Sequence, residues 1–179
     1  MKSEKELPDK VTKEKHNSVE AKELEQEKVT VMNVGKDISS LTFDQEKGIA
    51  WPVNGEVIMK YSADNVVYHA TLGQYKSNPA LVIASGEGSN VSCSADGVVT
   101  KIGENEEIGK YVETSVGDGY KITYGGLDNV QVKKGDTIDK REILGIVAPP
   151  TKYYVDEGPN VYLKMTCKNE PVDPMIFLE

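Results

Sequence analysis

Histidine, cysteine and arginine are scarce in this sequence of 179 residues. It contains 2 histidines, His16 and His69, 2 cysteines and a single arginine, Arg141. Histidine is the commonest metal ligand and the usual general base near neutral pH, so a catalytic site would have to work with one of these two residues or with none. No C-x-x-C pair and no Cys/His spacing typical of a zinc site is present.

Positive charge is also in deficit. Lys and Arg number 21 against 29 Asp and Glu, which gives a formal net charge of −8 at pH 7. Nucleic-acid backbones and anionic membrane surfaces are held by clusters of basic residues, so this balance argues against both as the main partner. The sequence has no apolar run of about 18 residues, which a transmembrane helix needs, and its length suits one domain with an appended tail.

The N-terminal part differs in composition from the rest. Residues 1–47 are rich in Lys and Glu and contain one aromatic residue, Phe43, so they offer little apolar surface to offset the entropy lost on folding. Residues 18–28 combine good helix formers with a Ser suited to an N-cap. We therefore expect a charged stalk or linker over 1–47, part helical or disordered, and a separate domain over 48–179.

From Gly48 onward, short β-branched runs alternate with Gly, Asn and Asp. Many short strands at close spacing are typical of a β-sandwich or barrel, and no amphipathic helix pattern is present after Gly48. The predicted fold class is therefore mostly β. The candidate strands are 55–61, 80–85, 90–94, 97–102, 111–116, 120–124, 130–132, 143–147 and 160–166. Residues suited to tight turns stand at Asp96-Gly97, Gly117-Asp118-Gly119 and Lys134-Gly135-Asp136.

Two segments carry a recognisable pattern. Residues 94–102 (SADGVVTKI) read as a turn and a strand, and residues 132–147 (VKKGDTIDKREILGIV) as strand, turn and strand. This pattern resembles the duplicated hybrid motif, or barrel-sandwich hybrid, which is shared by biotinyl and lipoyl carrier domains, the glucose-permease IIA domain and the LytM/lysostaphin-type zinc metallopeptidases. Taken alone, it implies a β-sandwich fold and no particular function.

The flanking segments select the peptidases among these relatives. Residues 119–127 (GYKITYGGL) resemble the "GY…YAHL" strand of the LytM family, residues 158–165 (GPNVYLKM) its "GPHLHFEV" strand, and residues 170–178 (EPVDPMIFL) its "KPVNPLLYL" end. Residues 78–91 resemble the segment that carries a His and, after three residues, an Asp. The similarity runs in unbroken order from residue 51 to residue 178, so residues 48–179 are identified as a LytM-like β domain.

The resemblance also shows which active-site residues are replaced. In active LytM peptidases two His and one Asp hold a zinc ion, and two further His act on the bound water and the oxyanion. The three metal positions fall here on Asn78, Val82 and Tyr162, and the two acid–base positions on Gly126 and Asn160. An amide is a poor zinc ligand, valine is none, and a phenol must first lose a proton with a pKa of about 10. We therefore expect no catalytic residue and no zinc, although zinc is the family's cofactor.

The same positions allow two interpretations. A groove that has lost its chemistry can keep amides and phenols that bind peptide or glycan backbones, or these side chains can simply fill the former metal cavity. Tyr124, Tyr153 and Tyr154 are the candidate groove-lining residues beside them. The last two follow a Pro-Pro pair, which fits either an exposed partner contact or a loop that caps the groove.

The remaining reactive side chains belong to no motif. His69 has no second His or carboxylate at a meaningful spacing, so we expect a surface or strand-edge position for it. Cys93 and Cys167 each fall within a candidate strand. Buried free thiols and a disulfide in an oxidising envelope both fit that placement.

These observations predict a catalytically inactive LytM-type homologue that acts as a binding or scaffold domain in the bacterial cell envelope. Its expected partner is peptidoglycan or an envelope protein, and not nucleic acid. Residues 51–57 (WPVNGEV) and 71–76 (TLGQYK) resemble Firmicute proteins of the stage II sporulation protein Q group. That resemblance implies an extracytoplasmic domain with a membrane anchor outside this chain. Two alternatives remain open: an active glycyl-glycine type cell-wall metalloendopeptidase with non-standard zinc ligands, and an amidase-activating regulator.

Overall fold

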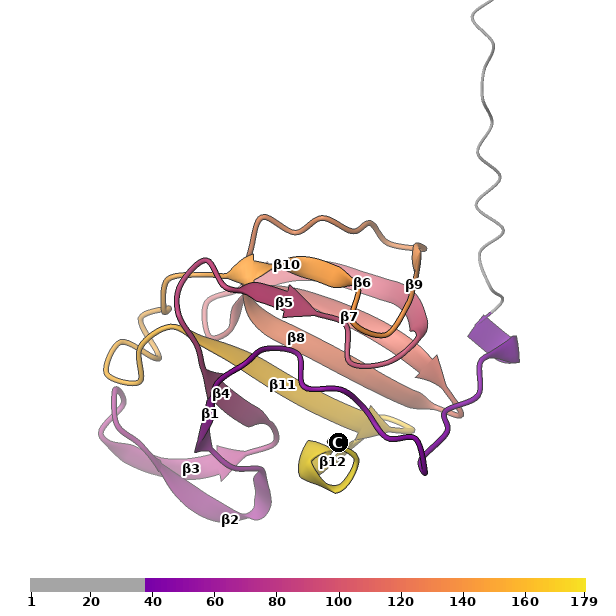
Figure 1. Ribbon diagram of the computed structural model, residues 1–179. Helices are drawn as coiled ribbons and strands as arrows, with labels where there is room; N and C mark the ends of the chain where they lie inside the picture. The colour runs from indigo at the N-terminus through magenta and orange to yellow at the C-terminus, as the bar shows by residue number, and fades with distance from the viewer. Residues whose placement is uncertain (1–37) are drawn as a thin grey trace, which may run out of the picture. The chain divides into compact units, whose positions relative to one another are not determined.

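The computed structural model describes residues 38–179. The predicted stalk helix at 18–28 lies outside the described residues. The described chain forms strands and two single-turn 3-10 helices, and the predicted mostly-β fold class is confirmed (Figure 1). The elements are η1 (Ile38–Ser40), β1 (Glu56–Met59), β2 (Ser62–His69), β3 (Gln74–Asn78), β4 (Leu81–Ala84), β5 (Asn90–Ser92), β6 (Gly97–Asn105), β7 (Gly109–Gly117), β8 (Tyr120–Asp128), β9 (Thr137–Ile138), β10 (Ile143–Val147), β11 (Asn160–Cys167), β12 (Glu170–Val172) and η2 (Pro174–Ile176).

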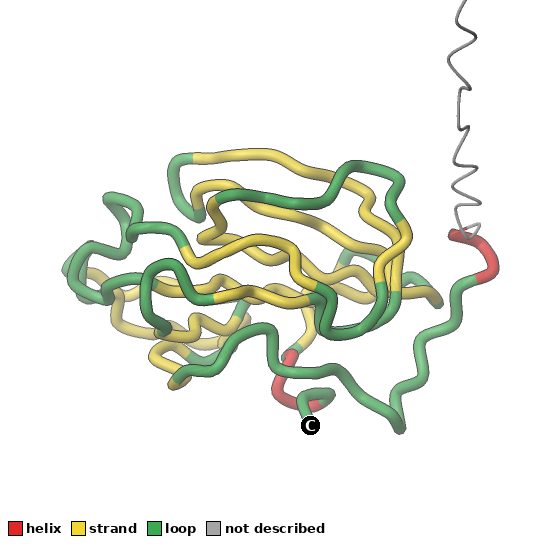
Figure 2. Tube along the Cα trace, turned by 45° about the horizontal axis from the view of Figure 1, so that its top comes forward, coloured by secondary structure: helices red, strands yellow, loops and turns green. Residues whose placement is uncertain are grey.

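One 10-stranded antiparallel sheet carries most of the fold. Its main path runs β1-β4-β11-β8-β7-β6-β9, and β12 pairs with β11. Strand β10 pairs with β5 and also with the end of β8, where Val147 lies opposite Leu127. Because of this double pairing the sheet folds over itself, and Figure 1 shows β5 and β10 lying over β8 and β11. Loops and turns connect the strands without any long helix, as the tube view shows (Figure 2).

The main core lies between these two layers. It is formed by strand residues whose side chains alternate inward, as expected for a sheet with one face buried. Fully buried members include Leu81, Ile83, Val91, Tyr124, Leu144, Leu163 and Met165. The residues between them on the same strands, Val82 on β4 and Tyr162 on β11, point to the opposite face. That opposite face carries the positions of functional interest.

The packed domain begins before the predicted boundary at residue 48. Phe43 is buried in the main core, and its ring lies 4.7 Å from that of Tyr120 and 5.6 Å from that of Phe177. Its backbone N–H also donates to Asp118 at 2.8 Å. An aromatic residue in a charged segment is thus buried by residues far away in the sequence, which composition alone does not reveal.

Two predicted turns are present as expected. Asp118 and Gly119 join β7 to β8 with φ values of 50° and 81°, and Gly135 precedes β9 with a φ of 94°. The candidate strand at 130–132 was wrong, because no strand forms there. Instead, the Gln131 N–H makes a backbone bond to the Leu144 carbonyl at 2.9 Å. Within the described residues, no helix has the length and apolar character needed to cross a membrane.

A separate two-stranded hairpin, β2–β3, was not predicted. His69 pairs with Gln74, and Tyr68 with Tyr75. One face of the hairpin is turned inward, where His69 and Asn78 are buried. The other face exposes Val66, Tyr68 and Tyr75. The hairpin therefore packs on the domain through its inner face and exposes two tyrosines, Tyr68 and Tyr75, on its outer face.

Candidate functional site

Strand register brings four of the five LytM positions together on the outer face of the sheet. Tyr162 on β11 lies directly opposite Val82 on β4 and, on its other side, opposite Gly125 of β8. Asn160 is two residues before Tyr162 and so shares its face. Gly126 follows Gly125 at a register irregularity between β7 and β8. The sequence similarity therefore identified residues that are true neighbours in the fold.

Asn78, the fifth position, ends β3 and is 2% exposed. Its amide Nδ2 donates to the Lys60 carbonyl at 3.0 Å and to the Ala80 carbonyl at 2.7 Å. Both amide protons are thus used, one to hold the turn between β3 and β4 and the other to tie it to the β1–β2 connection. The side chain serves the local backbone, which a buried amide must do to offset its desolvation.

An apolar cluster occupies the face on which the LytM resemblance puts the metal positions. Val82 is 0% exposed and packs with Met59 and Tyr154, and Tyr153 and Tyr162 lie against this group. We call these five residues the outer cluster. A cavity of about 30 Å³ remains beside it, lined by Gly126, Asn160, Tyr154 and Tyr162 among others. That volume is close to the share of a single water molecule in the liquid.

Gly126 excludes any side chain at its position. Its φ is 75°, in the left-handed region, and a Cβ added there would lie 2.3 Å from the Asn160 carbonyl oxygen. Its N–H donates to the Ile108 carbonyl at 2.6 Å and its carbonyl accepts from Ala148 at 2.9 Å. The backbone is therefore fixed in a conformation that a histidine could not adopt without moving β11.

The side chains at the five positions do not fit a zinc ion. Burial raises the pKa of Tyr162 to about 12, so its phenol stays protonated near neutral pH. Val82 offers no lone pair, and Asn160 donates its Nδ2 to the Gly158 carbonyl at 2.7 Å. Zinc in proteins is held by thiolate, imidazole or carboxylate, and within residues 38–179 no three His, Cys, Asp or Glu side chains gather closely enough to hold a metal.

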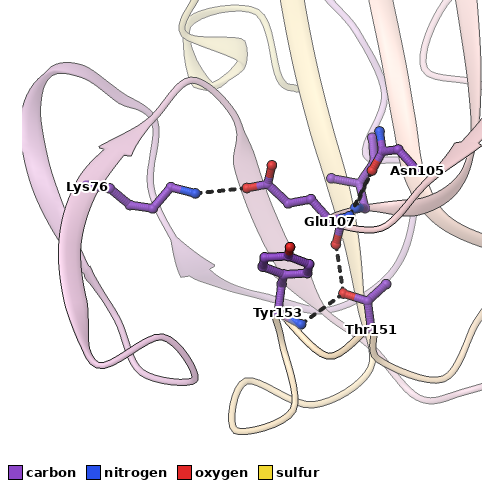
Figure 3. Close-up of polar contacts among 6 residues, drawn as sticks. Lys76, Asn105, Glu107, Thr151 and Tyr153 are labelled. Atoms are coloured by element: carbon purple, nitrogen blue, oxygen red, sulfur yellow. Dashed lines mark hydrogen bonds and ion pairs between the residues drawn. The ribbon is translucent and has the colours of Figure 1, made fainter.

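The loop after β10 contributes Tyr153 and Tyr154 to the outer cluster. Polar contacts with Glu107 hold this loop in place (Figure 3). The Thr151 hydroxyl donates to the Glu107 carbonyl at 2.7 Å and accepts from the Tyr153 N–H at 3.3 Å. The Glu107 carboxylate reaches across to Lys76 on the β2–β3 hairpin at 3.0 Å. One residue thus links the β6–β7 turn, the hairpin and the loop.

The three candidate groove tyrosines have different positions. Tyr124 lies in the main core with no exposed surface, so its prediction as a groove residue was wrong. Its hydroxyl accepts the Ser94 N–H at 2.9 Å, and burial raises its pKa well above the usual value. Tyr154 is 4% exposed and packs inside the outer cluster, and burial raises its pKa too. Tyr153 is half-buried at the edge of this cluster, with the Lys152 ammonium 5.4 Å from its ring centroid.

The remaining reactive residues form no second site. His69 is buried rather than at the surface, and its Nε2 has no hydrogen-bond partner among the described residues. Burial and, next, the charge of Lys76 lower its pKa. Cys93 and Cys167 are both free thiols. Cys93 contacts the Ala95 carbonyl, and burial raises its pKa to about 11, which makes it unreactive.

Sequence reasoning missed Met59 and Glu107. Met59 enters the outer cluster because a register shift in β1 places it opposite Val82, and no sequence pattern marks that shift. The turn that presents Glu107 does have a signal: Asn105 accepts the N–H groups of Glu107 and Ile108 at 3.0 and 2.9 Å, the local bonding for which Asn is favoured in turns.

The chain is similar to known proteins in both sequence and fold. The stage II sporulation protein Q of Bacillus subtilis (strain 168) is 26% identical over 116 residues, which cover 64% of this chain and 40% of that protein. The chain thus spans less than half the length of this curated relative. A solved complex of SpoIIIAH and SpoIIQ contains a chain with a TM-score of 0.62 and 26% identity, covering 72% of this chain and 99% of that one.

Active-type enzymes share the fold as well. A zinc-containing peptidase from Vibrio cholerae has a TM-score of 0.62 and 22% identity over 72% of this chain and 39% of its own. Residues 76–174, which include all five LytM positions, match the model of peptidase family M23. Because this match covers more than half of the chain, this chain belongs to peptidase family M23.

Proposed function

We propose that this chain is a non-catalytic, partner-binding domain of the bacterial cell envelope. The observation that carries the proposal is the outer cluster: Val82, Met59 and Tyr154 pack where a peptidase of this family holds zinc. Without a metal, water keeps a pKa far above 7, and neither Gly126 nor Asn160 can accept its proton. The metallopeptidase mechanism therefore has no means to proceed, and zinc is not a cofactor of this chain.

The outer face of the β2–β3 hairpin is the surface that we assign to the partner. Val66, Tyr68 and Tyr75 are 63%, 52% and 69% exposed, and the two tyrosine rings lie 5.2 Å apart. Val66 and Tyr68 are two residues apart on one strand, and Tyr75 is the cross-strand neighbour of Tyr68. Rigid, exposed aromatic side chains of this kind contribute strongly to protein–protein interfaces.

Contacts from the candidate site hold the β2–β3 hairpin in place. On its inner side the hairpin is held by the Lys76–Glu107 pair and by a hydrogen bond from the Thr71 N–H to Glu157 at 3.3 Å. The hairpin therefore presents its tyrosines from a fixed base, which reduces the entropy lost when a partner binds.

The partner that we propose is an envelope protein of the SpoIIIAH kind. Solved complexes of SpoIIQ with SpoIIIAH are among the structures most similar to this fold, and a curated SpoIIQ is similar in sequence. In this proposal the domain lies outside the cytoplasm, and its membrane anchor lies outside this chain.

The test is a binding titration of this chain against the SpoIIIAH-like protein of the same organism. We expect saturable binding that weakens at least tenfold in a Tyr68→Ser/Tyr75→Ser double variant, and that is unchanged in a Lys133→Ser/Lys134→Ser control on the distant β9 turn. Equal binding by the tyrosine variant would reject the surface. Clearing of a cell-wall suspension by the wild-type chain with zinc would reject the non-catalytic assignment.

A further inference from the structure

The single tryptophan and the single arginine of the chain line one groove. Trp51 and Arg141 are 90 residues apart in sequence, yet both border a groove of about 510 Å³ with Asn54, Asn90 and Ser92. None of its lining residues belongs to the outer cluster or its cavity. The volume lies within the range of small-molecule sites. We call this feature the Trp51 groove.

The groove has rigid walls. The segment that carries Trp51 is bonded by its backbone to β5 and to the residues just after it. The Ser92 N–H donates to the Pro52 carbonyl at 2.8 Å, and the Ala50 N–H donates to the Ser94 carbonyl at 2.8 Å. Gly55 closes the same segment against β4, because a Cβ there would lie 1.9 Å from the Ala84 carbonyl oxygen. Trp51 itself is 36% exposed. Its ring is thus presented by an ordered main chain.

Arg141 stands in a backbone conformation that does not favour arginine. Its φ is 73°, in the left-handed region that glycine adopts without strain. The position is fixed by hydrogen bonds, since the Arg141 N–H donates to the Cys93 carbonyl at 2.7 Å and the neighbouring Lys140 N–H donates to Asp96 at 2.6 Å. The turn therefore requires a positive φ at residue 141 and does not require an arginine side chain there.

The guanidinium of Arg141 makes no ion pair with any residue in the described range 38–179. Glu179, whose charge lies close enough to be felt, is bonded to Lys140 instead. Asn54 and Asn90 are exposed, and within the same range no side-chain bond engages their amides. The groove therefore combines an aromatic face, a free cation and two free amides.

This combination selects a class of ligand. A guanidinium binds carboxylates in a bidentate manner, and an indole face packs against the flat apolar side of a ring. A net charge of −8 disfavours multiply charged phosphates. An extended peptide would use an open strand edge, but β5 has both edges taken, by β10 and by residues 50–52.

We propose that the Trp51 groove binds an acidic sugar: a hexose ring that packs on Trp51, with its carboxylate on Arg141 and its polar substituents on Asn54 and Asn90. This site is independent of the partner surface on the hairpin. A loss of one activity would leave the other intact.

The experiment uses Trp51 as its own reporter, because it is the only tryptophan. Fluorescence of the whole chain is titrated with N-acetylmuramic acid and glucuronic acid, and with N-acetylglucosamine, acetate and trialanine as comparison probes. We expect a saturable emission change with the two acidic sugars and at least tenfold weaker binding of the other three. Arg141→Gly should weaken the acidic sugars at least tenfold while keeping the unfolding midpoint at or above that of the wild type.

Four results would overturn the proposal. No saturable change with either acidic sugar, or equal affinity in the wild type and Arg141→Gly, would remove the role of the guanidinium. Acetate binding as tightly as the sugars would show a bare anion site. Trialanine binding more tightly than the sugars would assign the groove to a peptide carboxylate. Because Arg141→Gly relieves backbone strain, a loss of binding cannot be attributed to a loss of folding.

Discussion

Replacing Val82 by aspartate tests whether the outer cluster is packed as described. Aspartate is the residue that the LytM resemblance implies at this position, but here it would enter a site with 0% exposure between Met59 and Tyr154. The change removes the burial of a valine side chain, worth about 1.5–3 kcal/mol, and adds the cost of burying an unpaired polar group. We expect Val82→Asp to lower the free energy of unfolding by about 3–5 kcal/mol.

The measurement is urea unfolding followed by Trp51 fluorescence, with thermal melting as a second readout. For a domain of this size the loss corresponds to a fall in Tm of about 10 °C. Val66→Asp is the matched control, since Val66 is 63% exposed, and it should change stability by no more than about 0.5 kcal/mol. Burial raises the pKa of an introduced carboxyl, so the deficit of Val82→Asp should shrink as the pH falls toward 4.

Adding zinc to Val82→Asp tests whether the introduced carboxylate completes a metal site. Added zinc should not restore the stability of Val82→Asp, because Asn78 is bonded to two carbonyls and the phenol of Tyr162 stays protonated. If Val82→Asp proves as stable as Val66→Asp, the outer cluster is not packed and the reasoning fails. A zinc-dependent rise in its Tm would refute the reasoning in a different way, by showing that a ligand set is present.

Three further predictions follow from buried groups. Burial lowers the pKa of His69, so its contribution to stability should be complete above the unfolded pKa of about 6.5 and be lost as the pH falls below that value. A His69→Gln variant should therefore show a flatter dependence of stability on pH between about pH 5 and 7. A pH dependence equal to that of the wild type would contradict this assignment. Tyr124→Phe leaves a buried backbone N–H without its acceptor and should cost about 1–3 kcal/mol in chemical unfolding; a neutral effect would mean that the bond is not formed. Gly126→Ala should destabilise the domain far more than Gly135→Ala. Both glycines have positive φ, but only at Gly126 would the added Cβ meet another atom, the Asn160 carbonyl oxygen at 2.3 Å. Equal melting temperatures of the two variants would rule out this close approach.

Much of the fold could be predicted from local patterns. Strands β4, β6 and β11 coincide with β-branched runs, and the Gly117-Asp118-Gly119 turn occurs where positive φ was needed. The β2–β3 hairpin could not be predicted in this way, because β2 has an irregular burial pattern and a register shift after Ser62. Its apolar residues Val66, Val67 and Tyr68 are consecutive, so the alternation of apolar and polar residues that marks a half-buried strand is missing.

The sequence could predict which residues form the candidate site, but not which side chains fill the space between them. The LytM resemblance located Val82 and Tyr162, and the register places them opposite each other. That Tyr154 would fill the space depends on the path of a loop held by Glu107. The bonds of Glu107 to Thr151 and Lys76 join residues that are distant in the sequence. Tyr124 shows the opposite error. It lies two residues before a lost catalytic position and yet faces the core, because a register irregularity at Gly125 and Gly126 breaks the alternation of side chains along β8.

The measurement that tests the central claim most directly is the zinc content of the chain. The protein would be purified after growth with added zinc, dialysed and analysed by inductively coupled plasma mass spectrometry, and the same sample would be assayed for clearing of a cell-wall suspension. The account predicts far less than one zinc ion per chain and no clearing. One zinc ion per chain, together with clearing that a chelator abolishes, would contradict it.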